Sequence, residues 1–322
     1  MSTVGLGTWQ LGADWGEVDE RDAMAVLDGA VEAGVTFFDT ADVYGDGRSE
    51  KLIGSYLGEH SSRESGLELV VGTKMGRRLE QVPENYVLEN FRGWVDRSRR
   101  NLEVDRLDLV QLHCPPTAVY SADAVYDALD TLVEEQSIAA YGVSVETADE
   151  ALTAISRRGT ATVQIILNVF RRKPLEFVLP AAEAAGVGII ARVPLASGLL
   201  SGRYDETTTF AENDHRSYNR NGEAFDVGET FSGVDYPTGV RAAQEFSRLV
   251  RELPFEATPA KAALAWIIQQ PGVTTVIPGA RSPEQARANA AAGDLPPLGA
   301  DFMAAVEALY AREIAPLVAD RW

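Results

Sequence analysis

With 322 residues and a hydrophobic fraction of 45%, the chain is long enough for a full core, which excludes a globally disordered protein. The formal charge of −19 argues against a nucleic-acid partner and fits either an ordinary acidic surface or adaptation to high salt. The sequence shows no signal peptide, no apolar run near the roughly 20 residues of a membrane span, and one cysteine, Cys114, so we expect a cytoplasmic protein.

Short apolar runs alternate along the chain with amphipathic stretches, a pattern that predicts buried parallel strands alternating with helices. The strands are predicted at residues 4–8, 36–39, 69–73, 107–112, 139–143, 162–167, 188–193 and 273–277. The helices are predicted at residues 19–33, 49–57, 84–102, 122–135, 147–158, 174–185 and 258–269. Thr258-Pro259 is typical of a helix start, and Gly34 and Gly186 are typical of helix ends.

Eight strands alternating with helices predict an α/β fold of the (β/α)8 TIM-barrel type, which we expect to span residues 1–322 as a single domain. The alternative is an open doubly wound sheet, which normally carries Gly-x-Gly-x-x-Gly after its first strand. Here Gly5-x-Gly7 continues as Thr8-Trp9-Gln10, so that fingerprint is absent and the barrel is favoured. Residues 196–236 form a long polar loop after the seventh strand, which we expect to lie over the barrel mouth.

Ionisable side chains close three of the predicted strands: Asp39, Lys74 and His113. Tyr44 follows Asp39 in the adjoining loop. Parallel strands in α/β proteins place their functional groups at their carboxyl ends, so we expect these four side chains to form one site.

These residue types suit the reduction of a carbonyl group. Tyrosine has an ordinary pKa near 10, and a nearby cation such as Lys74 lowers the pKa of its phenol, with Asp39 holding the ammonium in place. His113 supplies a donor that can orient or polarise a carbonyl oxygen. Because no side chain supplies hydride, a nicotinamide cofactor is predicted as its source.

Each residue also has a structural explanation when taken singly. Asp39 fits a helix cap, Tyr44 a packing ring, Lys74 a structural ion pair and His113 a core histidine. Cys114 beside His113 suggests a nucleophile pair, but adjacent residues of an extended segment point to opposite faces. With three histidines in the chain there is no His-rich metal spacing, and no metal is predicted.

Several segments together resemble the aldo-keto reductase superfamily. They are residues 37–45 (Phe-Phe-Asp-Thr-Ala-Asp-Val-Tyr-Gly), Gly72-Thr73-Lys74, Leu112-His113 and Ile277-Pro278-Gly279-Ala280. Within the superfamily the chain is most similar to bacterial and plant-type members related to potassium-channel β-subunits. The resemblance implies an NADPH-dependent reductase in which Tyr44 is the general acid, Lys74 and Asp39 tune it, and His113 orients the carbonyl.

The same resemblance implies a set of cofactor-binding residues. Ser144, Gln164 and Arg192 would lie by the nicotinamide; Pro194, Leu195, Ser197, Gly198, Leu200, Gly202 and Arg203 would pass the pyrophosphate; and Gly279, Arg281, Ser282, Gln285 and Asn289 would surround the adenosine 2′-phosphate. A guanidinium suits a phosphate dianion, and a helix starting near Pro283 would add its amides. NADPH is therefore favoured over NADH.

The sequence departs from the family pattern at three places. Val145 replaces an expected asparagine, and Arg192 replaces an aromatic ring against the nicotinamide. The charge of Arg192 predicts a weaker grip on oxidised cofactor. The first strand begins near Val4, so little or no N-terminal hairpin is expected.

The leading hypothesis is an enzyme that reduces an aldehyde or ketone, or in reverse oxidises a sugar or polyol. Trp9, Tyr44, His113, Cys114 and residues of the 196–236 loop are expected to line the substrate pocket. The expected partner is a small carbonyl or polyol, with no nucleic acid and no membrane. Two alternatives remain: a cofactor-binding subunit that senses redox state with little turnover, and a metal-dependent hydrolase that uses Asp39 and His113.

Overall fold

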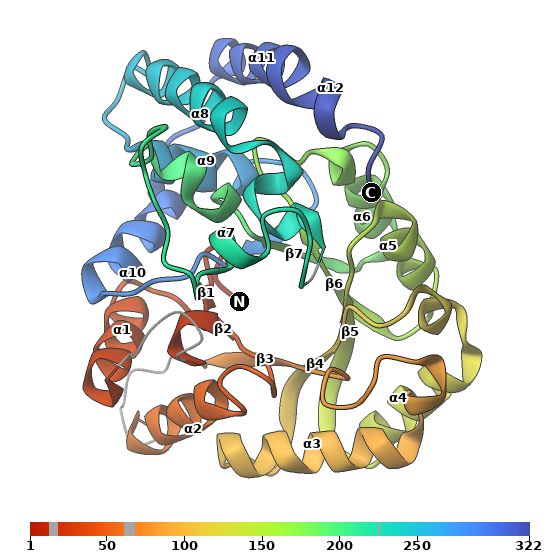
Figure 1. The fold of residues 1–322 in the computed structure, drawn as a ribbon. Helices are drawn as coiled ribbons and strands as arrows, with labels where there is room; N and C mark the ends of the chain where they lie inside the picture. The colour runs from red at the N-terminus through yellow and green to blue at the C-terminus, as the bar shows by residue number, and fades with distance from the viewer. Residues whose placement is uncertain (13–18, 61–67, 225) are drawn as a thin grey trace.

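The computed structural model describes residues 1–12, 19–60, 68–224 and 226–322. Its strands form one parallel sheet in the order β1 to β8, and Figure 1 looks down onto this ring of strands with helices around it. The strands are β1 (Leu6–Gly7), β2 (Phe37–Asp39), β3 (Val70–Met75), β4 (Leu107–His113), β5 (Ile138–Ser144), β6 (Thr160–Ile166), β7 (Gly188–Arg192) and β8 (Val273–Val276). Parallel bridges join Val4 to Val276 and Gly7 to Gly279, so the last strand meets the first and the predicted barrel is confirmed.

The predicted helices are present, with shifted boundaries. They are α1 (Glu20–Glu32), α2 (Arg48–His60), α3 (Leu88–Leu102), α4 (Asp123–Glu134), α5 (Ala148–Ile155), α6 (Val178–Ala185) and α9 (Pro259–Ile268). α3 starts later than predicted because Pro83–Asn85 forms a separate 3-10 turn. The helix start at Thr258 is confirmed, since its side chain accepts a hydrogen bond from the Lys261 amide at 3.2 Å.

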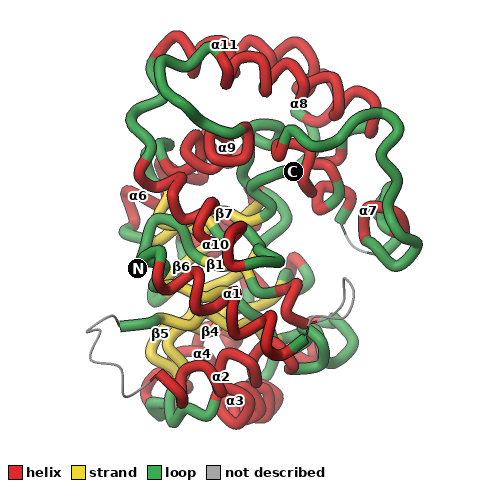
Figure 2. The backbone as a smooth tube through the Cα atoms, turned by 90° about the vertical axis from the view of Figure 1, so that its left-hand side faces the viewer, coloured by secondary structure: helices red, strands yellow, loops and turns green. Residues whose placement is uncertain are grey.

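Further helices lie outside the predicted set. They are α8 (Tyr236–Arg251), α10 (Pro283–Ala290), of which only the start was expected, α11 (Ala300–Leu309) and α12 (Ala315–Val318). In Figures 1 and 2, α8 and α11 lie side by side beyond α9. They thicken one side of the barrel without covering its mouth.

An apolar cluster fills the middle of the barrel, so the polar site lies above it at the barrel mouth. Phe37, Leu109, Ile190 and Ile277 form this cluster. Gly72 leaves space for the Phe37 ring, since a Cβ at this position would lie 3.0 Å from that ring. One layer above, the Gln164 amide donates to an Asp39 carboxylate oxygen at 2.7 Å. Side chains at the strand ends therefore rest on a packed floor instead of an open channel.

The 196–236 loop is structured and lies at the barrel mouth, apart from residue 225, which is outside the described residues. It contains the short helix α7 (His215–Tyr218), which Figure 2 places at the opposite end of the barrel from the N-terminus. Ser197 fixes the loop to itself: its hydroxyl donates to the Glu229 carbonyl at 2.8 Å and accepts from the Phe231 amide at 3.1 Å. The sequence predicted the position of this loop but none of its internal structure.

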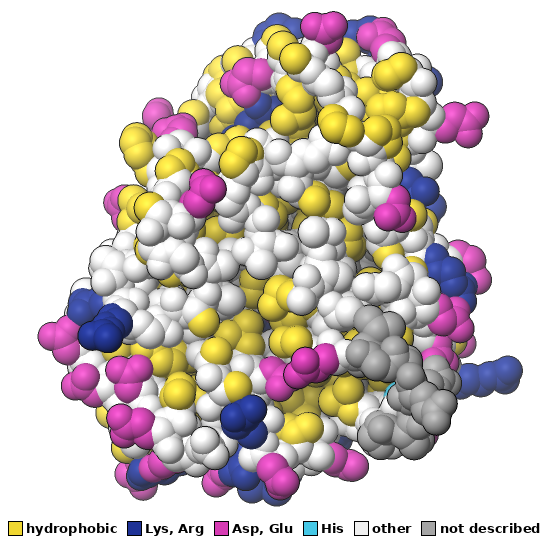
Figure 3. Space-filling model, turned by 180° about the vertical axis from the view of Figure 1, so that it is seen from behind, with side chains coloured by type: hydrophobic (Ala, Val, Ile, Leu, Met, Phe, Trp, Pro, Cys, Tyr) yellow, Lys and Arg dark blue, Asp and Glu magenta, His cyan; other side chains and the backbone are white. Residues whose placement is uncertain are grey.

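The opposite face of the barrel is shown in Figure 3, where acidic and basic side chains are interspersed and neither sign forms one continuous patch. Within residues 1–12 the structure has β1 and, after it, a 3-10 turn at Trp9–Gly12. In the described part of the chain, no helix is both long enough and apolar enough to cross a membrane.

Candidate active site

Three of the four predicted catalytic side chains meet around one ammonium group. Lys74 Nζ donates to Asp39 Oδ2 at 2.6 Å, to the Thr40 carbonyl at 2.9 Å and to Tyr44 Oη at 3.2 Å. Neighbouring strands β2 and β3 carry Asp39 and Lys74, and the loop after β2 returns Tyr44 to the same point. Lys74 and Asp39 are almost fully buried, so the ion pair lies beneath the tyrosine and away from water.

The pKa of Tyr44 differs from the sequence-based expectation. Burial raises the pKa of the phenol, Lys74 acts to lower it, and Asp39 and Glu229 raise it again, so the net pKa lies above its ordinary value. Lys74 therefore acts on this pKa in the predicted direction, but desolvation, which the sequence did not indicate, outweighs the cation. For Lys74, burial acts to lower the pKa, but Asp39 and Tyr44 outweigh it and raise the pKa. Tyr44 is thus protonated at neutral pH, the state that a proton donor requires.

His113 ends β4 and faces the same tyrosine. Its ring lies edge-on to Tyr44, with centroids 6.0 Å apart. Burial, together with Arg77, Lys74 and Arg192, holds the pKa of His113 well below its usual value. His113 is therefore a neutral imidazole, able to donate one hydrogen bond without carrying charge.

Cys114 lacks the environment of a nucleophile. Burial and the charge of Glu146 raise the pKa of its thiol to about 12. Its Sγ lies 3.3 Å from Ser144 Oγ, and the residue adopts a left-handed backbone with φ 45°. A thiol with this pKa stays protonated at neutral pH, which removes the support for a Cys/His nucleophile pair.

Arg192 lies in a cluster of buried charges. Its guanidinium forms an ion pair with Glu229, and another nitrogen donates to Glu146 Oε2 at 3.0 Å and to the Val145 carbonyl at 3.0 Å. The sequence-based hypothesis treated Arg192 as an isolated positive charge beside the nicotinamide. The structure adds two carboxylates, Glu146 and Glu229, which offset that charge and which the hypothesis did not include.

A cavity of about 560 Å³ opens at the carboxyl ends of the strands. Most of the predicted site residues line it: Trp9, Asp39, Tyr44, His113, Cys114, Ser144, Gln164, Arg192, Pro194, Leu195, Ser197, Gly198, Arg203, Gly279, Arg281 and Gln285. Lys74 lies behind Tyr44 instead. Leu200, Gly202, Ser282 and Asn289 are also absent from the cavity wall.

Two of those four residues support the wall from behind. Ser282 caps α10 by accepting from the Gln285 amide at 3.2 Å. Asn289 Nδ2 donates to the Gly279 carbonyl at 3.1 Å, which holds the turn after β8. Leu200 is fully buried, and Gly202 ends a 3-10 turn in a left-handed conformation.

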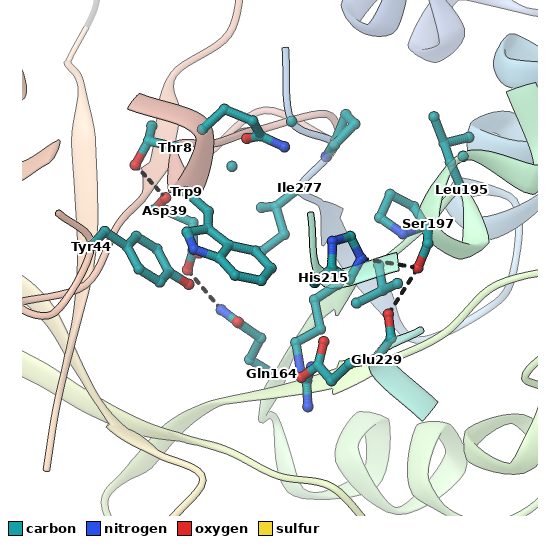
Figure 4. A pocket seen from close by; sticks show the side chains of 18 of the residues that line it. Thr8, Trp9, Asp39, Tyr44, Gln164, Leu195, Ser197, His215, Glu229 and Ile277 are labelled. Carbon is teal, nitrogen blue, oxygen red and sulfur yellow. Dashed lines mark hydrogen bonds and ion pairs between the residues drawn. The ribbon is translucent and has the colours of Figure 1, made fainter. Parts of the chain in front are cut away.

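Residues of the long loop complete the cavity, and no sequence pattern indicated them individually. His215, Glu229, Tyr204 and Arg216 all line it. In Figure 4 the Trp9 ring lies between Tyr44 and His215, with centroid distances of 6.1 Å and 5.7 Å. The Trp9 ring therefore connects Tyr44 to the long loop across the cavity.

Comparison with known proteins agrees with this geometry. The model of the aldo/keto reductase family matches residues 3–311. The aldo-keto reductase YhdN of Bacillus subtilis is 29% identical over 89% of this chain and 83% of its own length. A probable voltage-gated potassium channel β-subunit of rice is 28% identical, covering 92% of this chain and 89% of its own. A glycerol dehydrogenase of Gluconobacter oxydans superposes with a TM-score of 0.80 at 28% identity, covering 98% of this chain and 93% of that chain.

The chain belongs to the aldo/keto reductase family, and it is an oxidoreductase of the (β/α)8 barrel type. Its relatives include both bacterial reductases and plant channel subunits, as the sequence resemblance implied.

The donor chemistry of the cavity fits a phosphate-bearing cofactor. Arg203 and Arg281 both line the cavity, and α10 begins two residues after Arg281. Guanidinium groups and helix N-termini are preferred partners of phosphate. Among the described residues, no three His, Cys, Asp or Glu side chains lie close enough to bind a metal, so nothing there favours the hydrolase alternative.

Proposed function

We propose that this protein is an NADPH-dependent reductase that converts an aldehyde or ketone to an alcohol, with a sugar or polyol oxidised in the reverse direction. The observation that carries the proposal is Tyr44 Oη at 3.2 Å from the buried Lys74 ammonium at the wall of a large cavity. The bound cofactor would supply hydride to the carbonyl carbon.

Each catalytic side chain has one task in this proposal. Tyr44 donates its phenolic proton to the carbonyl oxygen as the C–H bond forms, leaving a phenolate and an alcohol. Lys74 stabilises that phenolate through the hydrogen bond already present, and Asp39 keeps Lys74 charged and oriented. Neutral His113 orients the carbonyl oxygen toward Tyr44. Solvent returns the proton to Tyr44 after product leaves.

The preference for NADPH over NADH is part of the proposal. Arg281 lines the cavity beside the start of α10, and Gln285 Oε1 accepts from the Arg281 amide at 2.9 Å, which orders this turn. A 2′-phosphate would find a guanidinium and helix amides at the same place. Structures of relatives from Klebsiella pneumoniae, which share the fold at 24% identity, contain NADPH or NADP.

The first test is steady-state oxidation of NADPH with 4-nitrobenzaldehyde, for the wild type beside Tyr44→Phe. Removing a positioned proton donor should lower kcat by about 10²–10⁴-fold while NADPH still binds. Equal turnover in the two proteins would remove Tyr44 from the mechanism. Absence of NADPH binding in the wild type would overturn the cofactor assignment.

The second candidate function, a regulatory subunit that senses redox state, rests on the similarity to plant channel β-subunits. Its signature would be a single slow turnover of bound NADPH without a steady-state rate. The intact tyrosine–lysine–aspartate contact favours the enzyme instead, because a sensor without turnover has no need of a proton donor.

A further inference from the structure

Three buried charged side chains, Arg192, Glu146 and Glu229, form a cluster at the cavity. One guanidinium faces two carboxylates, and their side chains are only 9%, 20% and 16% exposed. Burying three charges together is costly, and replacing such clusters by apolar residues often stabilises a protein. Stabilisation of the fold is therefore a weak explanation for the presence of this cluster.

The cluster adjoins the place where the reacting ring of the cofactor must lie. Strand register aligns His113 with Ser144 and Ser144 with Gln164. Arg192 pairs with Ile166, which lies two residues beyond Gln164 along β6. These strand ends form one continuous wall that starts at the predicted carbonyl-orienting histidine. Hydride transfer requires reacting atoms within about 3–3.5 Å, so these residues are the ones that would hold a ring serving a carbonyl at Tyr44.

Glu229 approaches this region from the long loop. It lines the cavity itself, whereas Glu146 reaches Arg192 from outside the lining. In Figure 4 Glu229 lies across the cavity from Tyr44. Its charge extends to the catalytic residue: after burial, Lys74 and Asp39, Glu229 is a further influence on the pKa of Tyr44, which it raises.

We propose that Glu229 is a specificity-determining residue for the redox state of the cofactor, favouring the oxidised form over the reduced form. The inference rests on the proposed function. The nicotinamide ring is positive when oxidised and neutral when reduced, so a fixed negative charge beside it stabilises only the oxidised form. Arg192 alone would act in the opposite direction, and the two carboxylates reverse its effect.

The test compares the dissociation constants of NADP⁺ and NADPH, measured separately by quenching of protein fluorescence, which Trp9 at the cavity wall makes sensitive to binding. Glu229→Gln should raise the ratio of the NADP⁺ constant to the NADPH constant by about tenfold, as expected for one partly buried charge near another. Glu146→Gln should change the ratio in the same direction by less. Glu229→Asp, which keeps the charge, should preserve it.

Glu212→Gln is the matched control, because it removes the same charge from an exposed position on the same loop. A loop that merely loosens would weaken both cofactor forms together and leave the ratio unchanged, which would overturn the proposal. An unchanged ratio in Glu229→Gln with full affinity would overturn it as well. A wild type that binds neither form would instead refute the proposed function on which the inference rests.

Discussion

The two sides of the barrel mouth handle buried charge differently. On the β2–β3 side, one ammonium meets one carboxylate, Lys74 with Asp39, and their side chains are 1% and 3% exposed. On the β7 side, one guanidinium meets two carboxylates, one of them on the long loop, and all three are partly reached by solvent. The first arrangement is neutral and rests on adjacent strands. The second is unbalanced and depends on how the loop docks.

This difference separates two requirements of the proposed reaction. Proton donation needs atoms fixed at short distances, and adjacent strands provide that precision. Binding and release of a cofactor need a wall that can adjust, and a loop held by ion pairs and single hydrogen bonds provides that freedom. We therefore expect substitutions on the β2–β3 side to affect turnover and folding, and those on the β7 side to affect cofactor binding.

The largest effect should come from Lys74→Met. Turnover should fall by at least about 10²-fold, because the phenolate of Tyr44 loses its stabilising cation. The free energy of unfolding should fall by about 3–5 kcal/mol, because Asp39 is left as a buried carboxylate without its cation. Steady-state kinetics and denaturant unfolding measure the two effects.

The double variant Lys74→Met with Asp39→Asn separates stability from catalysis. It removes both charges, so it should recover most of the lost stability and none of the lost turnover. A double variant as unstable as Lys74→Met alone would show that the ion pair is not the source of the stability change.

A smaller effect, on stability and dependent on pH, is expected at Asp42 in the loop between β2 and α2. Asp42 is fully buried, and neither of its carboxylate oxygens has a hydrogen-bond partner among the described residues. Burial, followed by the charge of Glu50, raises its pKa to about 7, although Arg78, Arg97 and Lys74 act to lower it. A pKa raised in the folded state means that the folded protein loses stability as pH rises from the ordinary value of 3.8 to about 7.

Asp42→Asn should abolish this loss. Its Tm should exceed that of the wild type by at least about 2 °C at pH 8, with a smaller difference at pH 5. Asp46→Asn on the same loop is the control, because Arg78 holds the pKa of the exposed Asp46 carboxyl below its usual value. A Tm difference for Asp42→Asn that is constant between pH 5 and pH 8 would contradict the assignment.

The same two sides also differ in how far the sequence predicted them. Asp39, Lys74 and His113 were predictable as neighbours because each closes or nearly closes a strand, and barrel geometry then fixes where strand ends lie. Glu229 and His215 were not, because their positions depend on contacts such as those of Ser197 that leave no periodic pattern.

The pKa of Tyr44 also escaped prediction, since the cation was visible in the sequence and the depth of burial was not. The helix α8 was also not predicted, although its sequence carried recognisable signals. Asp235 caps it by accepting from the Thr238 amide at 3.0 Å, and Pro237 lies in its first turn, so the ordinary signals of a helix start were present.

The smallest predicted effect lies on the β7 side, where Trp322 secures the loop segment that carries Glu229. The Arg171 guanidinium lies 3.7 Å from the centroid of the Trp322 ring, and Trp322 Nε1 donates to Asp226 Oδ1 at 3.0 Å. A cation–π contact with a buried arginine contributes about 0.5–2 kcal/mol. The loop keeps its other contacts, such as those of Ser197, so only part of this energy should be lost. Trp322→Ala should therefore speed NADPH dissociation, measured by stopped-flow fluorescence, by about two- to tenfold. Leu317→Ala, an exposed position in α12, should leave that rate unchanged. Faster dissociation in Trp322→Ala with normal turnover would support the expectation that the β7 side governs cofactor binding. A loss of turnover with an unchanged dissociation rate would contradict the division of roles between the two sides.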